Sequence, residues 1–303
     1  MIRRGLVIGA GGTVGGAWNV GVLAALQDAT GWDPRTADVI VGTSTGSTIA
    51  AMLGAGVGVA EMVDAHRGRS SARSSVRDFL GKPPPGLPNV RRPWPLAADA
   101  LVANLRNPLG AVAALVPEGQ HPWPQIDALA ADLAVDGWVA HPATWIVAYD
   151  IDDARLVTFG RSDSPKATLQ QAFRASWGVP GWFPRTVIDG HRFVDGAVAS
   201  SESADSLIDS DVDEVVVIAP MTGPLLPWRA GGLALAPVHQ ILTSALDRQC
   251  MALAQAGKRV LRVHPTVEDL IHMRVNPMEP ARRLVALDCG LRIDAHQSNW
   301  STP

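Results

Sequence analysis

The sequence has little of what marks several large classes of protein. Only 18% of its 303 residues are charged, the net charge is −3, and no long run of basic residues occurs. Nucleic acid is therefore not an expected partner, because nucleic-acid surfaces need clustered lysine and arginine. The two cysteines, Cys250 and Cys289, form no C-x-x-C pair and no metal-ligand spacing, so no metal site is predicted. Thiols this sparse are typical of a reducing compartment.

Long apolar runs are absent as well. No stretch of about 18 uncharged apolar residues is found, so no transmembrane helix is predicted. The basic start at residues 1–4 leads into a segment that glycines interrupt, which is not typical of a signal peptide. We therefore expect a cytoplasmic protein, and a peripheral position on the inner face of the membrane is a second expectation.

Hydrophobic residues, in contrast, make up 47% of the chain, which is enough to build a large core. Uniformly apolar runs at 39–41 and 214–219 are typical of buried parallel strands. Helical patterns alternate with such runs along the chain, and this alternation predicts an α/β fold with a mostly parallel sheet. We expect a single domain over residues 1–303.

Residues 68–124 break the alternation. Ser, Arg and Pro are frequent in 68–95, and proline at that density predicts that no regular helix or central strand forms there. Residues 96–116 are apolar and helical, with a break at Pro108. We predict that 68–124 is a cap or lid insertion, and an ordinary surface excursion is the alternative. The loop at 224–237, with Trp228, is a second candidate for closing a site or touching a membrane.

The stretch VIVGTSTGSTIAAML, residues 39–53, combines a strand, a sharp turn and a helix. Ser44 lies between Gly42 and Gly46, which gives G-x-S-x-G in the strand–turn–helix setting of a nucleophile elbow. A side chain at either glycine would clash in so tight a turn. The helix behind Ser44 directs its positive end at the hydroxyl. The pattern predicts a nucleophilic serine, and the alternative is a Gly/Ser-rich turn that caps a helix.

A serine nucleophile needs donors for the oxyanion that forms on attack. The glycine-rich loop 9–16 follows an apolar strand at 5–8 and precedes a helical pattern at 17–29. Glycines allow backbone N–H groups to converge on a substrate oxygen, and neighbouring parallel strands would bring this loop beside Ser44. The predicted oxyanion donors are the amides of Gly11, Gly12, Thr13 and Thr45.

The same loop is compatible with dinucleotide binding only in a loose form. The pattern G-x-G-x-x-G fails because Val14 stands at its last position. The strand at 39–41 does not end in the acidic residue that would bind a ribose. No cofactor is therefore predicted.

The base is harder to identify from the residues. None of the eight histidines stands in a setting that marks it as catalytic. Asp195 is better placed, because it ends a short strand at 192–195 and Gly196 lets the backbone turn and leave the carboxylate exposed. A common Asp-Gly turn is the alternative.

Four segments occur in one order and span residues 5 to about 220. They are the glycine-rich loop with AWNVGVLAAL (17–26), VGTSTGS (41–47), ASWGVPGWFP (175–184) and VDGAVAS (194–200). Together they resemble the patatin-like phospholipase family, which has the third segment ahead of its aspartate and D-G-G or D-G-A at the fourth. The resemblance implies a three-layer α/β/α fold and a Ser44–Asp195 dyad without histidine. The acidic residues of the chain show no metal-ligand spacing, so no metal is expected. The resemblance further implies hydrolysis of lipid acyl esters, with residues 11–13 as the oxyanion hole.

One departure from the family concerns the loop. Family members often carry arginine there, as in G-G-G-x-R-G, whereas the corresponding residue here is Val14 or Gly15. The backbone amide donors are unaffected by this change, but the loop has no arginine that could interact with an anionic substrate. Neutral esters therefore remain open as substrates beside phospholipids.

A dyad also needs an aspartate of unusual basicity. The pKa of a free aspartate is about 3.9, too low for an efficient base near pH 7. We expect partial burial beside Trp177, Trp182 or Phe193 to raise the pKa of Asp195.

Two other functions remain open. One is a Ser-His-Asp α/β-hydrolase, with its histidine among His191, His239, His264 and His272. The other is a lipid-binding or regulatory protein on a degenerate hydrolase scaffold. Reaction with a fluorophosphonate separates the last from the enzymes, because only an activated serine reacts.

Overall fold

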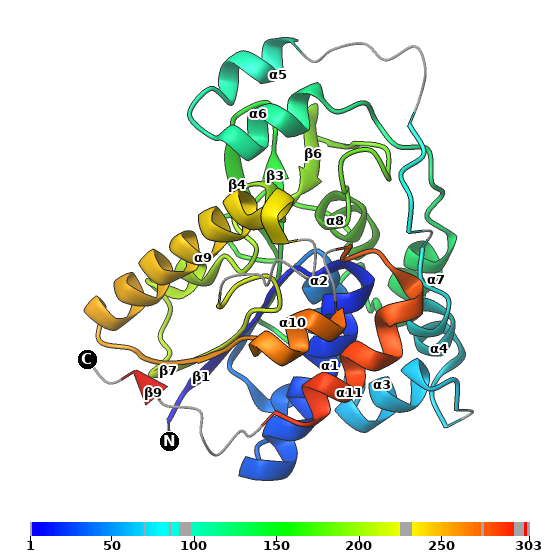
Figure 1. Ribbon diagram of the computed structural model, residues 1–303, viewed down its shortest axis with the longest axis vertical. Coiled ribbons are helices and arrows are strands. Elements are labelled where there is room, and N and C mark those ends of the chain that lie inside the picture. The colour runs from blue at the N-terminus through cyan, green and yellow to red at the C-terminus, as the bar shows by residue number, and fades with distance from the viewer. Residues whose placement is uncertain are drawn as a thin grey trace.

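A mixed nine-stranded sheet forms the centre of the molecule (Figure 1). The computed structural model describes residues 2–69, 71–84, 86–90, 98–224, 232–273, 276–293 and 300–301. The strands are β1 (Arg4–Ile8), β2 (Val39–Thr43), β3 (Thr144–Asp150), β4 (Arg155–Phe159), β5 (Thr186–Ile188), β6 (His191–Asp195), β7 (Glu214–Ile218), β8 (Arg259–Val263) and β9 (Trp300–Ser301). Their order is β5-β6-β3-β2-β1-β7-β8-β9, with β4 also paired to β3. The five strands from β3 to β8 along this order are parallel, as predicted.

Helices cover both faces of the sheet. They are α1 (Gly12–Thr30), α2 (Thr45–Gly54), α3 (Val59–His66), α4 (Ser74–Gly81), α5 (Ala98–Ala103), α6 (Pro108–Leu115), α7 (Pro124–Leu133), α8 (Leu169–Ser176), α9 (Gly232–Gln255), α10 (Val267–Met273) and α11 (Arg283–Leu291). Among the described residues, no helix is both long and apolar enough to cross a membrane.

The alternation of side chains along the strands explains the layers. Leu6 and Ile8 point into the core beneath α1, α2 and α8, whereas Val7 and Val41 point into the core beneath α9. Because both faces of these strands are apolar, both faces need a helical cover. The predicted three-layer α/β/α fold is confirmed. On the first face α1 and α11 lie side by side (Figure 1), and a Cβ at Gly290 would come within 2.3 Å of the Trp18 carbonyl oxygen.

Two helices differ from the sequence prediction. The helix predicted from residue 17 begins at Gly12, inside the predicted loop, because the Pro277 carbonyl accepts a hydrogen bond from the Val14 amide in its first turn (2.9 Å). The exclusion of regular helix from 68–95 was wrong, because α4 forms in that stretch. Its residues precede the prolines, and it buries Phe79 and Leu80 in the core.

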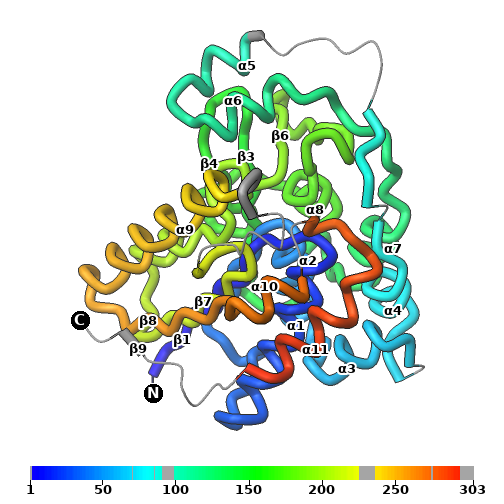
Figure 2. The backbone as a smooth tube through the Cα atoms, viewed as in Figure 1, coloured from blue at the N-terminus to red at the C-terminus, as the bar shows by residue number. Residues whose placement is uncertain are grey.

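The predicted insertion 68–124 packs on the core in two places. Helix α4 contacts α3 and α7, whereas α5 and α6 lie over the far end of β3 and β6, where Ala113 and Ala114 meet Tyr149 and Val194 (Figure 2). Its function as a lid stays a prediction. Residues 70, 85 and 91–97 of the insertion lie outside the described residues, as do 225–231 of the second candidate loop, with Trp228.

Candidate active site

Ser44 occupies a strained turn between β2 and α2. Its backbone has φ 55° and ψ −123°, a combination that residues with a side chain rarely adopt. A Cβ at Gly46 would lie 2.0 Å from the Ile8 carbonyl oxygen, and one at Gly42 would lie 2.2 Å from the Gly46 carbonyl oxygen. The two glycines therefore allow α2 to pack tightly against β1 and β2 directly behind the serine.

Two strands that run in opposite directions end at the same place on β3. Along one edge of β3, β2 pairs up to Thr43 opposite Val147, and β6 ends with Asp195 opposite Ala148, the next residue. The other edge of β3 is occupied by β4. The residue after β2 is Ser44, so the strand ends bring serine and aspartate together. The sequence prediction placed both residues at the carboxyl ends of parallel strands, whereas the strand that ends at Asp195, β6, is antiparallel to β3.

The segment ASWGVPG joins these two strand ends. Ser176, at the end of α8, accepts a hydrogen bond from the Ser44 amide (2.8 Å) and donates one to the Val147 carbonyl (2.6 Å). Two residues later, the Gly178 carbonyl accepts from the Asp195 amide (3.1 Å). The sequence prediction missed this function of Ser176, although the segment itself was singled out.

Asp195 is almost completely buried, with 4% of its surface exposed. Burial raises its pKa to about 6, while hydrogen bonds from the Ser44 hydroxyl and the Ala197 amide act in the opposite direction. The Ala197 amide lies 2.9 Å from Asp195 Oδ1. Desolvation of the carboxylate thus outweighs the donors that stabilise its charge, which is the direction expected from the sequence.

The glycine-rich turn leaves its first amides free. Gly12 has φ 57°, and among the described residues no hydrogen bond uses the N–H of Gly11, Gly12 or Thr13. The Thr45 amide is likewise without a partner in the described part of the chain. Helix α1 packs closely against the start of α2, since a Cβ placed on Gly16 would lie only 2.2 Å from Thr45 Oγ1. Four candidate oxyanion donors therefore lie at two adjoining helix starts.

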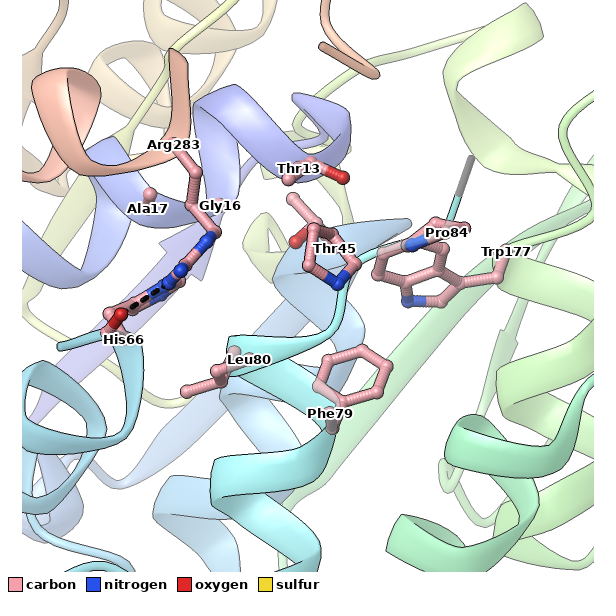
Figure 3. A pocket seen from close by; sticks show the side chains of 11 residues that line it. Thr13, Gly16, Ala17, Thr45, His66, Phe79, Leu80, Pro84, Trp177 and Arg283 are labelled. Atoms are coloured by element: carbon pink, nitrogen blue, oxygen red, sulfur yellow. Dashed lines mark hydrogen bonds between the residues drawn. The ribbon is translucent and has the colours of Figure 1, made fainter. Parts of the chain in front are cut away.

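A pocket opens beside these turns (Figure 3). It is lined by Thr13, Gly16, Ala17, Thr45, His66, Phe79, Leu80, Pro83, Pro84, Trp177 and Arg283. Its free volume is about 20 Å³, room for about one water molecule. A second cavity shares Phe79, Pro84 and Trp177 with it and continues to Trp123 and Phe183, whose rings stack at 4.2 Å. The first of the two cavities includes Thr45, the residue after Ser44, in its lining.

A different cluster has the side chains of a metal site. One potential ligand atom from each of Asp150, Asp152 and His191 lies within 4.8 Å of the others. Arginine already supplies positive charge there, because Arg192 donates to Asp152 and Arg155 lies 3.5 Å from Asp150. The cluster stands at the opposite end of β6 from Asp195.

Comparison with known proteins identifies the family. A family model described as Patatin-like phospholipase matches residues 6–208, whereas none of the curated proteins matches the chain. Among solved structures, the crystal structure of VipD from Legionella pneumophila is similar, with 15% identity and a TM-score of 0.44. The match covers 96% of this chain and 66% of that one, so the present chain spans about two thirds of it. The family model covers more than half of the residues, and the chain therefore belongs to the patatin-like phospholipase family, which implies lipid acyl hydrolase activity.

Proposed function

We propose that the protein hydrolyses carboxylic esters of lipids, as a phospholipase A or a related acyl hydrolase, through an acyl intermediate on Ser44. Asp195 is the base, and no histidine takes part. The observation that carries the proposal is the meeting of the two strand ends on β3, which places Ser44 beside a buried Asp195 whose pKa is raised to about 6. An aspartate with this pKa is mostly ionised at pH 7 and is a far better proton acceptor than a free one.

The first half of the reaction transfers the acyl group. Asp195 takes the proton of the Ser44 hydroxyl as the serine oxygen attacks the ester carbonyl carbon. The tetrahedral intermediate carries a negative oxygen, and the free amides of the Gly11–Thr13 turn and of Thr45 are the donors for it. The intermediate collapses, the carbon–oxygen bond to the alcohol breaks, and protonated Asp195 returns its proton to the departing alkoxide.

The second half reverses these steps with water. Asp195 takes a proton from a water molecule, which attacks the acyl carbon of the Ser44 ester. Collapse breaks the bond to Ser44, the proton passes to the serine oxygen, and the carboxylic acid leaves. The starting enzyme is restored with no net change at either residue, so a single carboxylate serves both halves.

The surroundings of the histidines support a reaction without imidazole. Among the described residues, no histidine hydrogen-bonds Ser44 or Asp195. His191 is close to Asp195 in sequence, but it lies 3.0 Å from Asp150 at the other end of β6. His296 lies outside the described residues.

The test is hydrolysis of a p-nitrophenyl ester and a panel of lipids. We expect Ser44→Ala and Asp195→Asn each to lower kcat/KM by about 10⁴-fold or more, because each removes a reacting group. Both variants should retain the circular dichroism of the wild type. A fluorophosphonate should label wild type and not Ser44→Ala. Substantial hydrolysis by Ser44→Ala would contradict the mechanism, and an unlabelled, inactive wild type would favour a lipid-binding protein.

A further inference from the structure

Four consecutive polar residues are buried just after the turn that carries Asp195. Ser200, Ser201, Glu202 and Ser203 each have 3% or less of their surface exposed. Ser203 also has φ 58°, a left-handed conformation that residues with a side chain rarely adopt. Buried polar groups and positive φ both cost stability, so packing alone does not explain this segment.

The segment joins the base to the proposed oxyanion turn. The Ser200 amide donates to the Gly196 carbonyl (3.0 Å), directly after the base. The Ala10 amide donates to the Ser201 carbonyl (2.8 Å), directly ahead of the turn at residues 11–13. One short stretch of backbone therefore fixes both sides of the reaction centre.

Helix α9 holds this segment from the other side. Gln249 donates from Nε2 to Ser200 Oγ (2.8 Å) and accepts at Oε1 from the Ala204 amide (3.0 Å). Ser200 Oγ also accepts from the Ser203 amide (2.8 Å). These bonds explain why Ser200 is polar, but they do not involve the carboxyl of Glu202.

The Glu202 side chain lies against the end of β1. A Cβ placed on Gly9 would come within 3.1 Å of Glu202 Oε1, so glycine leaves the room that the carboxyl occupies. The Ser201 hydroxyl donates to Oε2, whereas Oε1 has no hydrogen-bond partner among the described residues. Burial raises the pKa of Glu202 to about 7, while the Ser201 hydroxyl and the charge of Arg262 act in the opposite direction.

The ionisable groups around Glu202 do not neutralise its charge. Arg262 on β8 interacts with Glu202, but it is itself paired with Asp247 on α9. Cys250 on α9 also interacts with Glu202 and is neutral, because burial raises the pKa of its thiol to about 11. An ionised Glu202 would therefore add negative charge behind a turn that must stabilise a negative oxygen. In a dry interior such a charge acts strongly.

We propose that Glu202 is a positioning residue for the oxyanion turn and that it performs this function as a neutral acid. Its carboxyl supports Gly9 and the neighbouring Ser201 carbonyl holds Ala10, so the amides of residues 11–13 stay directed at the substrate oxygen. The inference rests on the proposed function, because it concerns the intermediate formed on the serine. A function in packing alone would not depend on the charge of this side chain.

The first test is the pH profile of p-nitrophenyl ester hydrolysis, corrected for spontaneous hydrolysis. We expect wild-type kcat to fall about tenfold between about pH 6.5 and 8.5, with KM changed less than about twofold, because the turn acts on the intermediate. Glu202→Gln is neutral at every pH, so its kcat should show no alkaline decline. Asp205→Asn, in the same stretch of chain but exposed, is the matched control and should show the wild-type profile.

A second variant shifts the profile instead of removing its alkaline part. Ser201→Ala lacks the hydroxyl that stabilises the ionised carboxyl, so the pKa of Glu202 should rise further. The decline in kcat should then begin at a higher pH than in wild type. A wild-type kcat that does not decline above about pH 7, or an equal decline in Glu202→Gln, would overturn the inference.

The pH dependence of stability does not need catalysis. The folded protein binds the Glu202 proton more tightly than the unfolded chain, whose glutamate pKa is about 4.3. This contribution is fully present below about pH 4 and is lost as the pH rises through about 7, so the Tm of wild type should fall more steeply over that rise than the Tm of Glu202→Gln. If wild type hydrolyses no ester, the proposed function fails, and equal Tm trends in the two proteins then reject the neutral state of Glu202 separately.

Discussion

Two hollows of very different size lie in different parts of the molecule, one near the start of β3 and one beside the Ser44 turn. The cleft near the start of β3, lined by residues from Asp136 to Gln171, has a free volume of about 550 Å³, against about 20 Å³ beside Ser44. At the large cleft Arg161 is paired with Asp163, and Ser164 donates to the Thr158 carbonyl.

Beside the small pocket, by contrast, a buried aspartate with a raised pKa lies next to Ser44. Volume therefore does not locate the chemistry of this molecule. A buried acid with a perturbed pKa does so, because electrostatic effects remain strong only where water is excluded.

The largest difference between the two hollows is expected from matched serine substitutions. Ser176→Ala removes the hydroxyl that joins the Ser44 amide to the Val147 carbonyl, and we expect kcat/KM to fall about 100-fold as the nucleophile shifts. Ser164→Ala also removes one bond from a serine to a backbone carbonyl, but in the large cleft. Its activity should stay within twofold of wild type.

Steady-state kinetics on one ester, with urea unfolding of both variants, checks this prediction. Ser164→Ala should lose about 1 kcal/mol of unfolding free energy, which is typical of one hydrogen bond, and Ser176→Ala about 2 kcal/mol, because it loses two. Equal activity losses in the two variants would mean that the small pocket has no special sensitivity. A fully active Ser176→Ala would mean that the elbow holds Ser44 without the bridge.

The pH dependence of activity should be the next difference between the two hollows. Asp195 must be ionised to accept the serine proton, so kcat/KM should fall about tenfold for each pH unit below about 6. Asp136→Asn, in the large cleft, should leave this profile unchanged. A profile of kcat/KM that is flat between pH 4 and 7 would contradict the function of Asp195 as the base.

The same raised pKa has the opposite sign for stability. The folded protein binds the Asp195 proton more tightly than the unfolded chain, whose aspartate pKa is about 3.9. The contribution is therefore fully present below about pH 4 and is lost as the pH rises through about 6. Over this pH range, ionisation of Asp195 thus raises activity and at the same time removes its contribution to the stability of the fold.

Local residue order was sufficient to predict the fold class and the position of the serine turn. The uniformly apolar strands, the glycines at Gly42 and Gly46, and the aspartate after a strand are each visible within a few neighbouring residues. The raised pKa of Asp195 could be predicted because a free aspartate is too weak a base to accept the serine proton near pH 7. The catalytic functions of Ser44 and Asp195 stay predictions until they are measured.

Other features depend on contacts between distant residues and could not be predicted. Ser176 meets Ser44 across 132 positions, and Arg283 meets His66 across 217. Helix α4 was missed because its composition is polar and proline follows it. The helix is stabilised by packing against α3 and α7 rather than by its own residues.

The smallest expected effect concerns backbone strain beside the two hollows. Ser44 has φ 55° and ψ −123°, whereas Asp136 has φ 52° ahead of Gly137 at φ 87°, as a type I′ turn requires. Asp-Gly suits such a turn, so little strain is stored at Asp136. We therefore expect Ser44→Gly to be more stable than Ser44→Ala by about 2 kcal/mol, and Asp136→Gly to exceed Asp136→Ala by no more than about 1 kcal/mol.

Urea unfolding of the four variants measures these differences, and each Gly–Ala pair cancels the effect of losing the original side chain. Both glycine variants also loosen the unfolded chain, which lowers both differences by a similar amount. Equal differences at positions 44 and 136 would show that the Ser44 turn stores no extra strain. A larger difference at position 44 would mean that the fold gives up stability to hold the serine in its turn, which the large cleft does not require of Asp136.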